Sequence, residues 1–214
     1  MRPLVALTAV LGLLAPVPGL SDPRLSARLD AGTAAEVERL VDTARSEGLP
    51  TGPLVSKALE GEAKGASSER IVAAVRAQLA ALGEARGALG SASTEAEMVA
   101  GAGALLAGVP RDSLARLRQT RPGKPLVVPL VVLADLVARK VPGEAAATAV
   151  LAGARAGAGD TDLLRMRQRV ERDIARGMMP ANAARLRARM WAPGLRSPGR
   201  DRRPPATERP GTTP

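Results

Sequence analysis

The sequence predicts an all-α protein, an irregular array of about eight or nine helices paired as helical hairpins. The first reason is composition: the 214 residues include no Phe, Tyr, His or Cys and a single Trp, so the aromatic residues that favour β-sheets are nearly absent. The second reason is a short helix-ending pattern that recurs along the chain. The third is that apolar residues between these endings follow helical spacing.

The helix-ending pattern is a small residue, usually Gly, followed by a hydrophobic residue and then Pro or Ser. Gly takes the left-handed conformation that ends a helix, the hydrophobic residue folds back onto the last turn, and Pro cannot continue the old helix. The pattern occurs at Gly48-Leu49-Pro50, Gly65-Ala66-Ser67, Gly108-Val109-Pro110, with one inserted residue at Gly177-Met178-Met179-Pro180, and without its Gly at Lys140-Val141-Pro142. Because the spacing is uneven, we interpret the array as a degenerate repeat.

Residues 1–21 are typical of a cleavable secretory signal peptide. Arg2 supplies positive charge, and Leu4–Ala15 is a run of 12 apolar or small residues. A membrane span needs about 20 such residues, so this run is too short to serve as one. We expect export to the periplasm or the extracellular space, with a mature chain that begins between about Leu20 and Asp22.

Capping signals mark the expected helix starts in the first half of the mature chain. Thr33 with Glu36 and Thr94 with Glu97 have the spacing of capping boxes, and Ser67 is expected to cap the helix between them, which runs to about Leu89. The apolar stripes of four successive helices are Val37, Leu40, Val41 and Ala44; Leu54, Val55, Ala58 and Leu59; Ile71, Val75, Leu79 and Leu82; and Met98, Ala102, Leu105 and Leu106.

The run Leu126–Leu133, which follows a short helix holding Leu114 and Leu117, is ambiguous, because a continuous Val-rich segment also suits a buried strand. Pro129 would damage a central strand but suits the first turn of a helix. We therefore predict a helix that is apolar nearly all round and lies at the centre of the fold. The remaining predicted helices run from Gly143 to about Ala156, from a cap at Asp160 through Ile174, and from Pro180 to Trp191.

Three parts of the chain follow from these signals: a signal peptide (1–21), one all-helical domain (22–191) and a tail (192–214). The tail holds six Pro and three Gly with almost no apolar residues. Such a segment cannot offset the entropy lost on ordering, so we expect it to be disordered.

The missing residue types exclude several classes of chemistry. Without Cys there is no disulfide, thiol nucleophile or thiolate zinc site, and without His there is no Ser-His-Asp triad or haem histidine. Carboxylates, Ser and Lys remain. We predict no catalytic residue, no cofactor and no metal ligand.

Two features that resemble sites have simpler explanations. The stretch Gly153–Asp162 lacks the Gly-Lys-Ser/Thr ending of a phosphate-binding loop, and Asp160 with Asp162 lacks the other ligands of a calcium loop, so we interpret it as a flexible corner with Asp160 as helix cap. The acidic pairs Glu36/Glu38, Glu60/Glu62 and Glu95/Glu97 are expected to lie on solvated helix faces.

Positive charge is the strongest functional signal. Residues 165–209 hold 13 Arg and 4 acidic residues, which accounts for nearly all of the net charge of +10. One interpretation is contact with a polyanion; the other is an Arg-rich composition on solvated surfaces. The candidate contact residues are Arg185, Arg187, Arg189, Arg196, Arg200, Arg202 and Arg203.

We therefore expect an exported, non-enzymatic helical scaffold or interaction module with a protein partner in the cell envelope. The first alternative is a binder of anionic lipid, surface polymer or nucleic acid through the Arg-rich C-terminal region. Sequence-specific recognition of nucleic acid is disfavoured, because Trp191 is the single aromatic residue on which a base would stack. A carboxylate-dependent enzyme is the second alternative.

Overall fold

A computed structural model describes residues 22–191, and over that range the chain forms helices joined by turns and loops, with no strand. The all-α prediction is confirmed for this part of the chain. The predicted signal peptide (1–21) and the predicted disordered tail (192–214) lie outside the described residues. The range contains ten helices, and the one that the sequence did not predict is the first and shortest.

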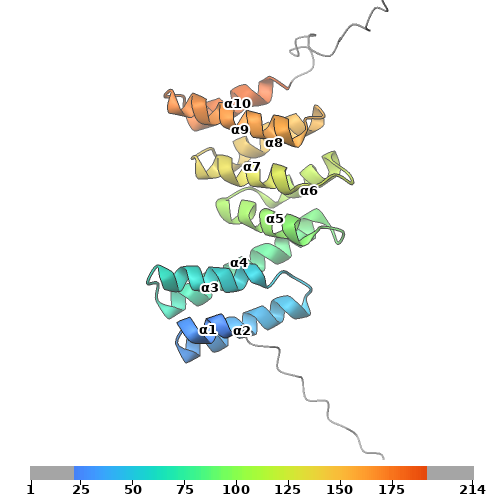
Figure 1. The fold of residues 1–214 in the computed structure, drawn as a ribbon. Coiled ribbons are helices and arrows are strands. Elements are labelled where there is room, and N and C mark those ends of the chain that lie inside the picture. Colours follow the sequence, from blue (N-terminus) through green and yellow to red (C-terminus); the bar gives the residue numbers. More distant parts are fainter. Residues whose placement is uncertain (1–21, 192–214) are drawn as a thin grey trace, which may run out of the picture. The chain divides into compact units, whose positions relative to one another are not determined.

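The chain divides into two compact units, one ending at Arg76 and the other beginning at Ala77. The N-terminal unit contains α1 (Pro23–Arg28), α2 (Ala31–Ser46), α3 (Gly52–Ala63) and the first part of α4 (Ser68–Leu89). The C-terminal unit contains the rest of α4, α5 (Glu95–Ala107), α6 (Arg111–Thr120), α7 (Val127–Ala138), α8 (Gly143–Arg155), α9 (Asp160–Ala175) and α10 (Pro180–Arg189) (Figure 1). None of the helices in the described range is long and apolar enough to cross a bilayer.

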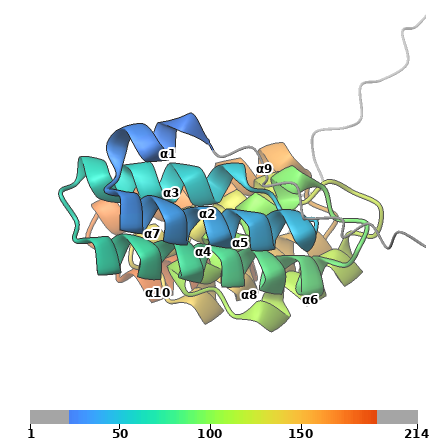
Figure 2. The same cartoon turned by 90° about the horizontal axis from the view of Figure 1, so that it is seen from below.

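In the N-terminal unit, α1 and α2 contact each other and both pack on α3 (Figure 2). The apolar stripes predicted for α2 and α3 supply the core: Val37, Leu54 and Ala58 are fully buried, together with Leu25 of α1. An ion pair between Arg28 and Glu62, 3.0 Å from Nη2 to Oε2, joins α1 to α3 at the surface.

The start of α2 differs from the prediction, because Asp30 and not Thr33 is the capping residue. The Asp30 carboxylate accepts a hydrogen bond from the Thr33 N–H at 3.0 Å and another from the Thr33 hydroxyl at 2.6 Å, so the helix begins one turn earlier. Hydrogen bonds from the Thr33 hydroxyl, the Thr33 N–H and Ser68 lower the pKa of Asp30 to about 2. The capping box predicted for Thr94 and Glu97 is confirmed.

The helices of the C-terminal unit pack in two rows. In one row α7 contacts both α5 and α9, and in the other α8 contacts both α6 and α10. Helices α7 and α8 also contact each other, as do α9 and α10. Figure 1 shows α5, α7 and α9 lying one after another. Each of the hairpins α5–α6, α7–α8 and α9–α10 therefore contributes one helix to each row.

Helix α7 occupies the central position that the sequence predicts for Leu126–Leu133. It packs on α5, α8 and α9, and it begins as a helix with Pro129 buried in its first turn. Leu130, Leu133 and Leu136 are essentially inaccessible to solvent. One side of α7 is nevertheless open, because Val131 is 42% exposed.

Six helix ends in the described range share one pair of backbone hydrogen bonds. At Gly108, the N–H donates to the Leu105 carbonyl at 2.9 Å, and the Val109 N–H donates to the Ala104 carbonyl at 3.0 Å. This is the Schellman motif, which needs a left-handed residue at its centre. The same bonds close the helices at Gly48, Gly65, Lys140, Gly157 and Gly177. The predicted helix endings are thus confirmed, and Lys140 takes the left-handed conformation with φ of 66°.

Candidate anion-binding face

Four arginines follow one side of α9. Arg165, Arg169, Arg172 and Arg176 are spaced by four, three and four residues, which places them along one face of a helix. All four are exposed. We call these residues the arginine stripe.

The carboxylates of α9 point away from most of this stripe, because each is paired with an arginine elsewhere or at its edge. Two of them pair with residues that directly follow other helices: Asp160 lies 2.8 Å from Arg121 Nη2, after α6, and Glu171 lies 2.8 Å from Arg139 Nη2, after α7. The remaining pairs are Asp173 with Arg187 and Asp162 with Arg165.

Charge is therefore divided between two sides of α9. On the inner side, Arg167 forms an ion pair with Asp135 of α7. On the outer side, no carboxylate in the described part of the chain pairs with Arg169, Arg172 or Arg176. Three positive charges thus remain available to an outside anion.

Helix α10 extends this basic surface with two of the three residues that the sequence singled out there. Arg185 and Arg189 are exposed and lie four residues apart. Arg187 is engaged differently: its Nε donates to Asp173 Oδ2 at 2.9 Å, and the ion pair is largely shielded from solvent. Arg187 therefore ties α10 to α9, and we leave it out of the basic face.

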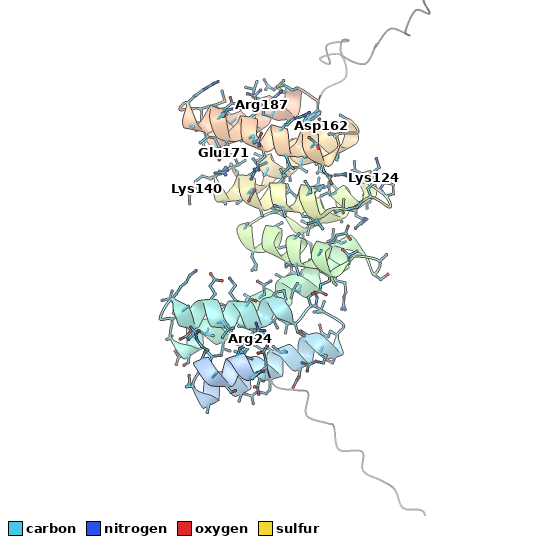
Figure 3. The ribbon with its side chains drawn as sticks, in the orientation of Figure 1. Arg24, Lys124, Lys140, Asp162, Glu171 and Arg187 are labelled. Atoms are coloured by element: carbon cyan, nitrogen blue, oxygen red, sulfur yellow. The ribbon has the colours of Figure 1, made fainter. Side chains whose placement is uncertain are left out.

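A hollow of about 210 Å³ lies between α9 and α10. It is lined by Asp162, Arg165, Met166 and Arg169 from α9 and by Arg187, Met190 and Trp191 from the end of α10. Asp162 and Arg187 are labelled on this hairpin in Figure 3. The indole Nε1 of Trp191 lies 3.5 Å from Met166 Sδ, so the single aromatic ring of the chain forms part of the wall.

Exposed apolar side chains also gather on this hairpin. Among the described residues seven large hydrophobic side chains are exposed, and five of them belong to α9, α10 or the corner between them: Leu164, Met178, Met179, Leu186 and Met190. Met179, Leu186 and Met190 are spaced by seven and four residues and are 67%, 41% and 42% exposed, so they follow one side of α10. We call these three residues the apolar edge.

The other predicted contact residues, Arg196, Arg200, Arg202 and Arg203, lie outside the described residues. The arginine stripe was missed as a unit, although the predicted basic region includes it. Its signal was the helical spacing of Arg165, Arg169, Arg172 and Arg176 within one predicted helix.

Glu97 was expected on a solvated face and is instead buried, with 4% of its surface exposed. Oε2 accepts the Thr94 N–H at 3.0 Å, while Oε1 accepts the Leu126 N–H at 2.9 Å and pairs with Arg118 Nη2 at 2.8 Å. Burial raises the pKa of Glu97, but these three donors outweigh burial and hold the pKa below its usual value. Glu97 is the third residue of α5 and closes its capping box, and at that position it also contacts Arg118 of α6.

The stretch Gly153–Asp162 is a corner, as predicted, but its cap differs. Helix α9 begins at Asp160 itself, with Gly159 in the capping position, and Asp162 Oδ2 accepts the Gly159 N–H at 3.2 Å. Asp160 Oδ1 instead accepts a hydrogen bond from Arg121 Nη2 at 2.8 Å. No group of three or more carboxylates within the described range is arranged to hold a metal ion.

The chain matches no protein-family model, no curated protein and no solved structure. The face built by the arginine stripe, the hollow and the apolar edge is the feature that packing within the C-terminal unit leaves unexplained.

Proposed function

We propose that the protein is an exported, non-enzymatic helical interaction module with a partner in the cell envelope or outside the cell. The supporting observation is the outer face of the α9–α10 hairpin, which combines exposed arginines with exposed apolar side chains. Exposed apolar patches that are rimmed by polar residues are typical of interaction sites.

The state of the buried carboxylates supports a binding role over an enzymatic one. In the described residues the buried carboxylates are Glu97 and Asp173, and both are held by arginines, Arg118 and Arg187. A carboxylate that accepts three hydrogen bonds and has a lowered pKa stays ionised and joins helices together. General acid–base catalysis favours the opposite condition, a pKa near the working pH.

We further propose that the hairpins α5–α6, α7–α8 and α9–α10 are copies of one degenerate repeat. Their corners at Gly108, Lys140 and Gly177 share the same hydrogen bonds, and their helices alternate between the two rows. In such arrays each unit contacts its neighbours, and the units at the ends keep one face without a neighbour. Among the described residues, α9–α10 is the last of these hairpins, and no further described helix packs on its outer face.

Export is tested by N-terminal sequencing of the protein purified from its native cells. The apolar run Leu4–Ala15 after Arg2 supports cleavage, so the mature chain should begin between about Leu20 and Asp22. Intact Met1 on protein from the cytoplasm would contradict export.

The interaction role is tested by a pull-down from the native cell envelope with a tagged mature chain, at low and at high salt. We expect one component to be retained in an amount comparable to the bait. A bait that retains nothing at either salt concentration would contradict the proposal.

Binding of a polyanion is the second candidate function, and the arginine stripe favours it specifically. Guanidinium groups bind phosphate and carboxylate groups through paired hydrogen bonds, and their exposure on one face lets several act together. Residues 192–209, which follow α10 in the sequence, contain five more arginines.

Deletion of residues 192–214 separates the contribution of the tail from that of the helices. The deletion removes Arg196, Arg200, Arg202, Arg203 and Arg209, so the truncated chain should elute from a heparin column at lower salt than the mature chain. The tail has almost no apolar residues, so we expect thermal unfolding of the helical part to change little. Unfolding of the helices on truncation would contradict the disorder predicted for the tail.

A further inference from the structure

We infer that the outer face of the α9–α10 hairpin docks on the surface of an anionic lipid bilayer. This inference rests on the proposed anion binding and specifies its partner. The arginine stripe would contact lipid phosphates, and the apolar edge would enter the boundary between headgroups and acyl chains.

The arginine stripe and the apolar edge belong to one surface. The hollow between α9 and α10 is lined by Arg165 and Arg169 on one side and by Met190 and Trp191 on the other. The arginine stripe and the apolar edge therefore run along adjacent helices that meet at this hollow. Basic and apolar side chains arranged in this way are typical of helices that lie in a membrane interface.

The charge of this surface is complementary to that of an anionic bilayer. The stripe residues Arg169, Arg172 and Arg176 have no carboxylate partner in the described range, and Arg185 and Arg189 of α10 add two further exposed cations. The surface of an anionic bilayer attracts each such cation, and the attraction falls off within a Debye length. The five exposed cations of this hairpin therefore all contribute to its attraction to such a surface.

The apolar edge distinguishes a bilayer from a soluble polyanion. Heparin or nucleic acid would satisfy the arginines but would leave Met179, Leu186 and Met190 in water. An anionic bilayer would pair with the arginines and would also remove these apolar side chains from water, which is favourable. Trp191, at the end of α10, also has the amphipathic ring that favours the headgroup region.

A second copy of the same chain is a weaker occupant for this face. In a two-fold dimer the same patch meets itself, so the arginine stripe of one copy would lie near that of the other. Like charges brought together across an interface disfavour the complex. Docking on an anionic bilayer brings no like charges together.

The experiment uses the single Trp of the chain as its reporter. The mature protein is mixed with vesicles of phosphatidylcholine alone and with vesicles that also contain phosphatidylglycerol, and binding is measured by flotation. We expect binding to the anionic vesicles only, with a blue shift of Trp191 emission. Brominated acyl chains should quench that emission, because the ring lies at the interface.

Two double variants localise the contact. Leu186→Gln with Met190→Gln removes most of the apolar edge, whereas Leu106→Gln with Val131→Gln changes two equally exposed side chains elsewhere in the C-terminal unit. We expect the first pair to weaken vesicle binding about tenfold, which corresponds to about 1.4 kcal/mol, because the exposed parts of the two side chains together gain a free energy of about that size on leaving water. The second pair should leave binding unchanged. Circular dichroism checks that both remain helical.

Several outcomes would overturn the inference. Vesicle binding without quenching by brominated lipid, equal weakening by both double variants, or a concentration-dependent dimer that covers Trp191 would each contradict docking on lipid. Retention on heparin without binding to anionic vesicles would reject the lipid surface and leave the proposed anion binding intact. Failure to bind either one would reject both.

Discussion

Glu97 joins three elements of the C-terminal unit through one carboxylate. It closes the capping box of α5, accepts the Leu126 N–H in front of α7 and pairs with Arg118 of α6. Arg118 also donates to the Lys124 carbonyl at 3.1 Å, so the loop between α6 and α7 is fixed at the same point.

Replacement of Glu97 by Ala should lower the free energy of unfolding by about 2–4 kcal/mol, because it removes the carboxylate that pairs with Arg118 and leaves the buried Leu126 N–H without its acceptor. Glu95→Ala is the matched control: Glu95 lies in the same first turn but is exposed, so its loss should cost about 0.5 kcal/mol or less. Urea denaturation of both variants measures the difference. Equal effects would show that the Glu97 contacts do not stabilise the fold.

Lys140 occupies the left-handed position of its corner, where five sister corners have Gly. A Cβ in this conformation costs about 1 kcal/mol, so Lys140→Gly should raise the free energy of unfolding by about that amount. Lys140→Ala keeps the Cβ and controls for loss of the charged side chain. A gain in both variants would assign the effect to charge instead of backbone conformation.

At the scale of whole elements, helix α8 begins against the corner that ends α5. A Cβ added at Gly143, the first residue of α8, would collide with the carbonyl oxygen of Gly108, and a backbone atom cannot rotate away. This close approach lets α8 follow directly behind the α5–α6 hairpin. Gly143 therefore determines how neighbouring hairpins stack.

Gly143→Ala should destabilise the protein by about 1–3 kcal/mol through this collision. Gly103→Ala in α5 is the control, because a Cβ there has open space and should stabilise the helix by up to about 1 kcal/mol. Thermal unfolding of the two variants should move in opposite directions. A Gly143→Ala variant as stable as the natural chain would show that the corner adapts.

Local signals predicted most of the elements, and tertiary contacts account for the differences. The helix endings were predicted because the Schellman motif is specified by adjacent residues. The predicted start of α2 is wrong because Asp30 and Thr33 are both residue types that cap helices. Which of them caps α2 depends on the hydrogen bond from the Thr33 hydroxyl to Asp30. Helix α1 was missed because its six residues are too few for an apolar stripe.

The candidate face was only partly predictable. Composition locates the basic region and helical spacing aligns the arginine stripe, but knowing that most of the stripe lacks carboxylate partners requires knowing which side of α9 packs on its neighbours. The ion pair of Arg167 with Asp135 shows which side of α9 meets α7, and the pair of Arg187 with Asp173 shows which side meets α10. Both are contacts between residues distant enough in sequence that spacing alone does not reveal them.

For the molecule as a whole, the absence of His, Cys and Tyr predicts an unusual pH profile. No side chain of the chain has an ordinary pKa between about 5 and 9, so stability should be nearly constant there. Ion pairing with Lys57 and Lys64 lowers the pKa of Glu60 from 4.5 to about 2, and hydrogen bonds from Thr33 lower that of Asp30 from 3.8 to about 2.

Because these folded-state pKa values lie below the unfolded ones, the unfolded chain binds more protons in acid. Stability should therefore be fully present above about pH 4.5 and fall as the pH drops toward 2. Urea midpoints measured from pH 2 to pH 9 test this profile. A marked change between pH 6 and pH 8 would contradict it.

The anion binding and the lipid docking both depend on the claim that the arginine stripe contacts an anionic partner, and the salt dependence of heparin binding measures that contact. The proteins compared are the mature chain, a variant with Arg169, Arg172 and Arg176 changed to Gln, and a control with the exposed Arg70, Arg116 and Arg155 changed to Gln. Both variants lose the same charge. If each stripe residue pairs with one anionic group, the slope of log affinity against log salt should become shallower by about 2–3 in the stripe variant and remain unchanged in the control. Equal slopes in all three proteins, or no binding at low salt, would contradict the claim.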